Sequence, residues 1–205
     1  MRIPHLLLSL CLALSPCSVR AQSFFRNLEG YMLFGASSVP AQTIGGSSLA
    51  APGAVAGALE IGYAYPVLRR PHANLSVEAI SVFGGADESN AAGALDRGWF
   101  APALPGLRVE VPLRSRLAVY GAAGGGVGSF DMPYVGPGAI PSLQSTSTWH
   151  GIFEFGGGVD VSLFGPVSLR VEMRDYVTGA GLSGVAGRNH PIPAGGLIFR
   201  ARNPK

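Results

Sequence analysis

An alternation of apolar and ionic residues, VSLRVEMRDYV at residues 167–177, constrains the fold of this chain more than any other stretch. Side chains alternate across an extended strand with a period of two, so this segment would have one apolar face and one ionic face. The apolar face holds Val167, Leu169, Val171 and Met173. The ionic face holds Ser168, Arg170, Glu172, Arg174 and Tyr176. One such strand fits a soluble two-layer protein as well as a barrel in lipid, so the two folds are distinguished by whether the rest of the chain repeats the pattern.

Seven further windows alternate in a similar way, and segments rich in proline and glycine separate them. Because proline interrupts the hydrogen-bond ladder of a sheet, strands are expected in the windows between prolines. The eight predicted strands are residues 28–36, 54–65, 74–83, 106–113, 117–130, 150–163, 167–177 and 194–201. Their connections alternate between long and short, which would place both chain ends beside the short turns. Their lengths bracket the roughly 9 to 11 residues that a tilted strand needs to cross a bilayer.

These features predict an all-β fold, namely an eight-stranded antiparallel up-and-down transmembrane β-barrel after an N-terminal signal peptide. The composition agrees, because only 13% of the residues are charged, against roughly 25% in an ordinary soluble domain. After the leader, no window resembles an apolar run of about 18 residues, so a transmembrane helix is not expected. A secreted chain with so few charges is expected to lie in lipid.

Residues 1–21 have the layout of a secretory signal peptide, and residues 22–205 are predicted to form the barrel domain. A charged residue, a short apolar run and a small-residue cleavage site follow one another in that leader. An alternative is a lipoprotein processed at Cys17, which Pro16 immediately before it fits poorly. Cys11 also lies in the leader, so the mature chain would have neither a disulfide nor a cysteine metal ligand.

Three stretches resemble the small outer-membrane barrel superfamily typified by the OmpA transmembrane domain: EIGYAYPV at 60–67, SLRVEMRDYVTG at 168–179 and AGGLIFRA at 194–201. The resemblance implies a porin-like barrel in the outer membrane of a Gram-negative bacterium, in contact with its lipids and inserted by the barrel assembly machinery. Such barrels usually end on an aromatic residue, whereas here six residues follow Phe199. Whether Phe199 serves as the assembly signal stays open.

Charged residues of both signs recur on the predicted inward faces of the strands, where isolated charge would be costly. We predict that they form an ionic network in the lumen, which consists of Glu60, Glu78, Arg108, Glu110, Glu154, Asp160, Arg170, Glu172, Arg174 and Arg200. An eight-stranded barrel is just wide enough for its own side chains to fill it. The predicted function is therefore that of an integral membrane protein with a filled, salt-bridged lumen and exposed loops, in a structural or surface-interaction role without catalysis.

Glycines on adjacent strands would clear a hollow inside the barrel, and arginines, Tyr120 or Tyr176 could occupy it. These glycines are Gly124, Gly126, Gly128, Gly156 and Gly158. The alternative function is a narrow passive pore for small ions or solutes, which requires the hollow to stay wet.

Two other functions are open at this point. A lipid-modifying outer-membrane enzyme could use His150 as a base, a hydroxyl from Ser145, Ser147 or Thr148, and the Asp175 carboxylate. Such a site would need these groups within hydrogen-bond reach of one another. A soluble secreted lipid-binding barrel would instead turn its apolar faces inward.

Basic residues gather in the predicted periplasmic turns, at Arg69, Arg70, Arg114 and Arg116, with Glu29 as the acid nearest that end. Each cation near an anionic membrane surface contributes about 1 kcal/mol. We therefore expect this basic end to contact anionic phospholipid head groups. We expect a monomer with no cofactor, no metal site and no nucleic-acid partner, and the ligand of the long loops is not readable from the sequence.

Overall fold

The computed structural model describes residues 27–39, 42–43, 50–51, 54–85, 87–90, 93–96, 98–136, 142–178 and 189–200. The expected signal peptide lies outside the described residues. The barrel strands are β1 (Glu29–Val39), β4 (Ala54–Arg69), β5 (Asn74–Gly85), β8 (Trp99–Arg114), β9 (Leu117–Gly136), β10 (Ser142–Phe164), β11 (Val167–Thr178) and β12 (Asn189–Arg200). The connections between these strands contain two short hairpins. In the first, β2 (Gln42–Thr43) pairs with β3 (Ala50–Ala51), and in the second, β6 (Asp87–Asn90) pairs with β7 (Gly93–Asp96).

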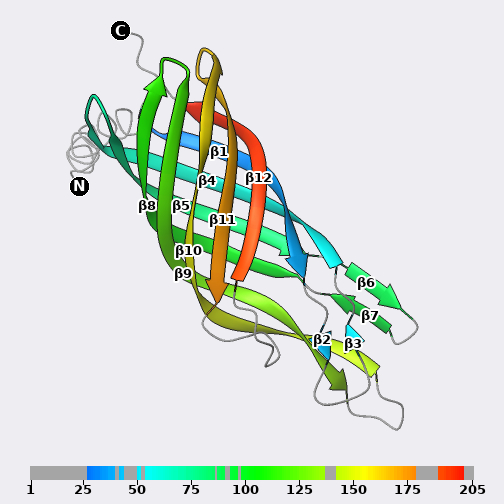
Figure 1. Cartoon of the computed structure of the whole chain (residues 1–205). Coiled ribbons are helices and arrows are strands. Elements are labelled where there is room, and N and C mark those ends of the chain that lie inside the picture. Colours follow the sequence, from blue (N-terminus) through cyan, green and yellow to red (C-terminus); the bar gives the residue numbers. More distant parts are fainter. Residues whose placement is uncertain are drawn as a thin grey trace, which may run out of the picture.

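The eight long strands form a closed antiparallel barrel in the order β1-β12-β11-β10-β9-β8-β5-β4. The first strand closes against the last, with Glu29 opposite Arg200 and Gly35 opposite Ala194. β1 therefore begins and β12 ends at one end of the barrel, together with the tight β8–β9 and β10–β11 turns (Figure 1). The β2–β3 and β6–β7 hairpins lie beyond the opposite end. The predicted eight-stranded up-and-down barrel is confirmed.

Several strands extend further toward the long-loop end than the sequence predicts. β8 begins at Trp99 inside a predicted loop, and β9 and β10 continue together until Gly136 pairs with Ser142. The prediction of a loop at 131–149 is therefore wrong, because most of this segment forms a β-hairpin that projects beyond the barrel (Figure 1). β12 likewise begins at Asn189 rather than at residue 194.

The outer surface of the barrel is a belt of exposed apolar side chains. Phe34 is 61% exposed and Val171 is 58% exposed, values typical of a surface rather than a core. Other members of the belt are Met32, Val55, Tyr63, Val77, Phe83, Leu107, Val109, Val127, Phe153, Phe155, Met173, Leu197 and Phe199. An apolar surface this large is unfavourable in water and favourable in hydrocarbon. The alternative of a soluble barrel with inward apolar faces does not fit this orientation.

In the part of the chain that the structure describes, no helix is long and apolar enough to span a bilayer.

The barrel interior has two zones. Toward the long-loop end, aliphatic and aromatic side chains fill it, among them Ile80, Leu104, Phe130 and Ile192, with Trp99 packed against them. Trp99 stacks on the Phe130 ring with a centroid separation of 5.7 Å. Toward the short-turn end, the buried side chains are mainly ionic. The apolar zone leaves the ionic zone with little access to water from the long-loop side.

Candidate functional site

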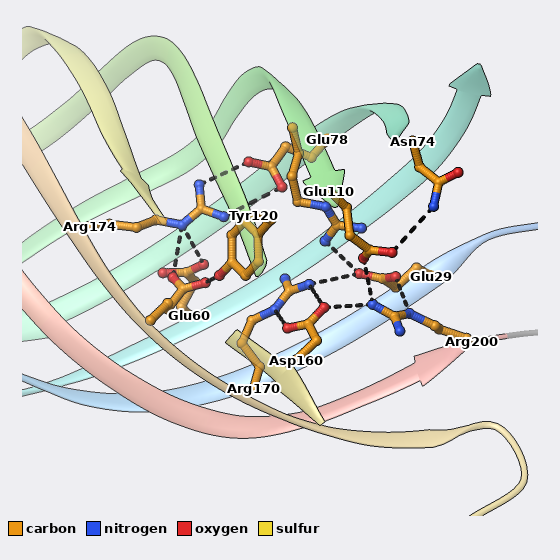
Figure 2. Close-up of polar contacts among 12 residues, drawn as sticks. Glu29, Glu60, Asn74, Glu78, Glu110, Tyr120, Asp160, Arg170, Arg174 and Arg200 are labelled. Carbon is orange, nitrogen blue, oxygen red and sulfur yellow. Dashed lines mark hydrogen bonds and ion pairs between the residues drawn. The ribbon is translucent and has the colours of Figure 1, made fainter. Parts of the chain in front are cut away.

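The candidate site is the ionic zone of the lumen, and its first group lies near the short-turn end. Both Nε and Nη2 of Arg170 donate to the Asp160 carboxylate, each at 2.8 Å. Arg200 donates to Glu29 at 2.7 Å and to Glu110 at 2.8 Å. Figure 2 shows these side chains converging from strands on different sides of the barrel.

Glu29 holds this first group together. Its Oε1 accepts hydrogen bonds from Arg108 and from Arg170, and its Oε2 accepts one from Arg200. Three carboxylates, Glu29, Glu110 and Asp160, thus face three guanidinium groups. Opposite charges in equal number, joined by direct hydrogen bonds, offset the cost of removing them from water.

The second group surrounds Arg174, whose side chain is completely buried. Its Nη1 donates to Glu78 and to Glu154, each at 2.9 Å, and its Nε donates to Glu172 at 2.8 Å. Glu60 completes the group, with 3.6 Å between its Oε1 and the Arg174 Nε. Four carboxylates therefore depend on a single guanidinium group, in contrast to the balanced first group.

Tyr120 joins the two groups, and Tyr176 contacts the second. Tyr176 donates to Glu60 at 2.7 Å, and Tyr120 donates to Glu172. The Arg170 guanidinium lies over the Tyr120 ring at 4.4 Å and over the Tyr31 ring at 4.7 Å. These contacts hold the guanidinium of Arg170 between two aromatic faces, where cation–π attraction adds to its ion pairs.

Glycines on β9 and β10 provide the space for this network. A Cβ at Gly156 would lie 2.8 Å from Cγ of Arg174, and one at Gly158 would lie 2.8 Å from Cβ of Glu172. A Cβ at Gly124 would lie 2.7 Å from Oε1 of Glu154. All three positions would overlap a network side chain or the adjacent backbone. At these three positions ionic side chains occupy the hollow that the sequence predicts, whereas Gly126 and Gly128 face Leu104, Ile152 and Phe130 of the apolar zone.

The structure places all ten residues of the predicted network in the lumen. Glu110 and Arg200 are partly buried and the other eight are buried. Glu29 is missing from the predicted network, because its place in the sequence suggests the basic end instead. The alternation of Glu29 with Tyr31 and Leu33 could have revealed it, because all three lie on the inward face of β1.

The four arginines of the predicted basic end lie at turns and are exposed. Arg69 ends β4 and Arg70 follows it, while Arg114 ends β8 and Arg116 lies in the β8–β9 turn. Arg69 makes a long contact of 3.4 Å with the Asn27 side chain. These side chains therefore lie at two neighbouring turns of the short-turn end, the β4–β5 and β8–β9 turns.

The groups considered for catalysis do not assemble. His150 lies 2.9 Å from Thr148 Oγ1 on the inward face of β10, whereas Ser147 faces outward and donates to Asp131. Asp175 accepts a hydrogen bond from the His190 backbone N–H. The side chain of Ser145 lies outside the described residues. Among the described residues, no group of three or more His, Cys, Asp or Glu side chains has a metal-binding arrangement.

The class of protein follows from three features of the structure: a closed ring of eight strands, an apolar exterior and an ionic lumen. The chain has the fold of the small eight-stranded outer-membrane β-barrels. No model of a known protein family matches the chain, and no curated protein matches it.

Two solved structures illustrate this likeness. One is Ail, the attachment invasion locus protein of Yersinia pestis, in complex with the heparin analogue sucrose octasulfate. It has a TM-score of 0.52 and 13% sequence identity, and the match covers 85% of this chain and 99% of Ail. The other is Neisserial surface protein A, with a TM-score of 0.54, 14% identity, and coverage of 85% of this chain and 97% of that protein. At these sequence identities the likeness shows a shared fold alone.

Proposed function

We propose that this protein is a non-catalytic integral protein of the outer membrane of a Gram-negative bacterium, with a lumen that its own ionic network closes. The observation that carries the proposal is the position of Arg170 and Arg174, whose buried side chains bind carboxylates from several strands across the interior. In a barrel of this width, such side chains occupy the cross-section that solutes would need. The protein would then act as a rigid membrane anchor that presents the β6–β7 and β9–β10 hairpins at the cell surface.

The conductance of the barrel tests the closed lumen. After reconstitution of the folded protein in a planar bilayer, we expect no reproducible unitary current steps, because the network and the apolar zone both block the lumen. Folding of the same preparation is checked by its heat-modifiable migration on gels. Regular steps from the folded protein would contradict the proposal and would favour the narrow passive pore.

The absence of catalysis is tested on lipids. Outer-membrane lipids are compared by mass spectrometry after expression of the protein and of a His150→Ala variant. We expect identical lipid profiles, because His150 contacts Thr148 while Asp175 lies on the outer face of β11 and contacts the His190 backbone. A lipid species present only with the unaltered protein would support an enzyme instead.

The basic end belongs to the same proposal, with anionic phospholipid head groups of the periplasmic leaflet as its partner. The four arginines are exposed at two turns of the short-turn end, and each contributes about 1 kcal/mol near an anionic surface. Replacing Arg69, Arg70, Arg114 and Arg116 together by glutamine is expected to weaken association with phosphatidylglycerol vesicles and to randomise the insertion direction. The distribution of protease-accessible ends measures that direction. Unchanged association and direction would refute this part of the proposal.

A further inference from the structure

Glu60 is the least well paired carboxylate of the second ionic group, although its side chain is only 4% exposed. Its Oε2 accepts a hydrogen bond from the Tyr176 hydroxyl at 2.7 Å. Its Oε1 is buried and accepts no hydrogen bond from the described residues, and Nε of Arg174 lies 3.6 Å away (Figure 2). An ionised carboxylate in such surroundings is costly unless a proton or a closer cation neutralises it.

Arg174 does not supply that closer cation, because its shortest contacts are with other glutamates. Its single Nε hydrogen is donated to Glu172 at 2.8 Å, and Nη1 donates to Glu78 and Glu154. Among the described residues, the four glutamates of the group form ion pairs with no other arginine. If all four were ionised, four negative charges would face one positive charge in a medium where like charges repel strongly.

The Glu60 and Glu172 carboxyl groups lie within hydrogen-bond distance of each other. An ionised carboxylate has no hydrogen to donate, so this contact is repulsive when both groups are charged. When one group carries a proton, its O–H donates to the other and the contact becomes attractive. Each group also accepts a tyrosine hydroxyl, Glu60 from Tyr176 and Glu172 from Tyr120. These hydroxyls do not remove the repulsion, because they are neutral.

The groups that surround this pair add more negative than positive charge. Around the pair and Arg174 lie Tyr31 on β1, Glu78 on β5, Tyr120 on β9, Glu154 on β10 and Tyr176 on β11. The nearest cations of the first group, Arg108 and Arg170, lie over the Tyr120 ring and are paired within that group. The Tyr31 hydroxyl is buried and has no hydrogen-bond partner among the described residues, a contact that a protonated carboxyl group can supply.

We propose that the Glu60–Glu172 pair binds one proton at neutral pH, so that a hydrogen bond between two carboxyl groups helps to close the lumen. A glutamate in water loses its proton at about pH 4.3, so above that pH the folded barrel carries one proton more than the unfolded chain. Stability falls with rising pH wherever the folded state binds more protons. The barrel is therefore expected to weaken in alkaline medium. The inference depends on the lumen alone and applies to the barrel in detergent as well as in a membrane.

Infrared spectroscopy detects the proton directly, because a protonated carboxylic acid has a C=O stretching band distinct from the bands of carboxylates and of the backbone. We expect this band from the folded, unaltered protein in detergent at about pH 7, where a glutamate in water is ionised. The band is expected to lose intensity in Glu60→Gln or in Glu172→Gln, so one variant suffices if the other does not fold. Absence of the band from the unaltered protein, or an unchanged band in both variants, would overturn the proposal.

The pH dependence of urea unfolding is the second measurement. Glu60→Gln can donate an amide N–H to Glu172 in place of the proton, and it does not titrate. From about pH 6 to pH 7, the unfolding constant of the unaltered protein is expected to rise about tenfold relative to that of Glu60→Gln, the factor for one proton. Glu110→Gln is the matched control and is expected to keep the steeper profile, because Glu110 is paired with Arg200 at 2.8 Å. Parallel profiles for Glu60→Gln and the unaltered protein would contradict the proposal.

Discussion

Replacement of Arg174 by methionine is expected to lower the free energy of unfolding by about 3–5 kcal/mol, the loss typical when one partner of a buried ion-pair group is removed. The variant keeps an unbranched side chain of similar length but leaves Glu60, Glu78, Glu154 and Glu172 without their common cation. Like charges in a medium of low dielectric repel one another strongly. The midpoint of urea unfolding in lipid vesicles, followed by tryptophan fluorescence, measures the loss.

A matched variant separates this effect from a general loss of arginine. Arg116→Met changes an exposed turn residue and is expected to alter the free energy of unfolding by less than about 0.5 kcal/mol. Adding Glu78→Gln and Glu154→Gln to Arg174→Met is expected to restore part of the lost stability, because two of the uncompensated charges are removed. A triple variant less stable than Arg174→Met alone would show that charge repulsion is not the cause.

The second large effect is expected at the seam between the first and last barrel strands. Gly196 faces Leu33 across the β1–β12 pairing, and a Cβ there would overlap the Met32 carbonyl oxygen and lie 2.8 Å from Leu33 Cα. Because backbone atoms cannot move aside like a flexible side chain, Gly196→Ala must push the two strands apart. We expect the free energy of unfolding to fall by about 3 kcal/mol, which is at the upper end of the usual cost of overpacking.

Gly151→Ala is the control for this variant. Gly151 lies in β10, and a Cβ there would meet nothing within 4 Å. It introduces the same methyl group into a strand without a clash, so the free energy of unfolding is expected to change little. If both variants lowered the free energy of unfolding by a similar amount, the cause would be the reduced flexibility of the strand and not the closure of the barrel.

The faces of the barrel strands could be predicted from the sequence because a period of two requires no knowledge of the partners. Val171 and Glu172 are neighbours in the chain, and the structure places the first outside and the second inside. The same alternation predicted that Glu60, Glu78 and Arg108 share the lumen. It could not predict which acid binds which base, because ion pairs such as Arg174 with Glu78 join residues 96 positions apart.

The first part of β8 could not be predicted, because its prolines argue against a strand. In the structure, Pro102 and Pro105 are exposed on the outer face, and the pairing of β8 shifts between Phe100 and Ala103. The Pro102 carbonyl still accepts a hydrogen bond from the Ser81 hydroxyl at 2.6 Å. An irregularity of this kind accommodates proline in a ladder, and no local pattern in the sequence marks it.

The contact between Glu29 and Arg200 has a consequence for biogenesis. These residues are 171 positions apart and belong to the first and last strands of the ring. A nascent barrel that lacks its final strand would leave Glu110 without this cation and would expose the edges of two strands to lipid, where unpaired backbone groups are costly. The first ionic group therefore pairs its three carboxylates with three guanidinium groups only in the complete chain, so we expect a chain truncated before β12 not to form a stable barrel.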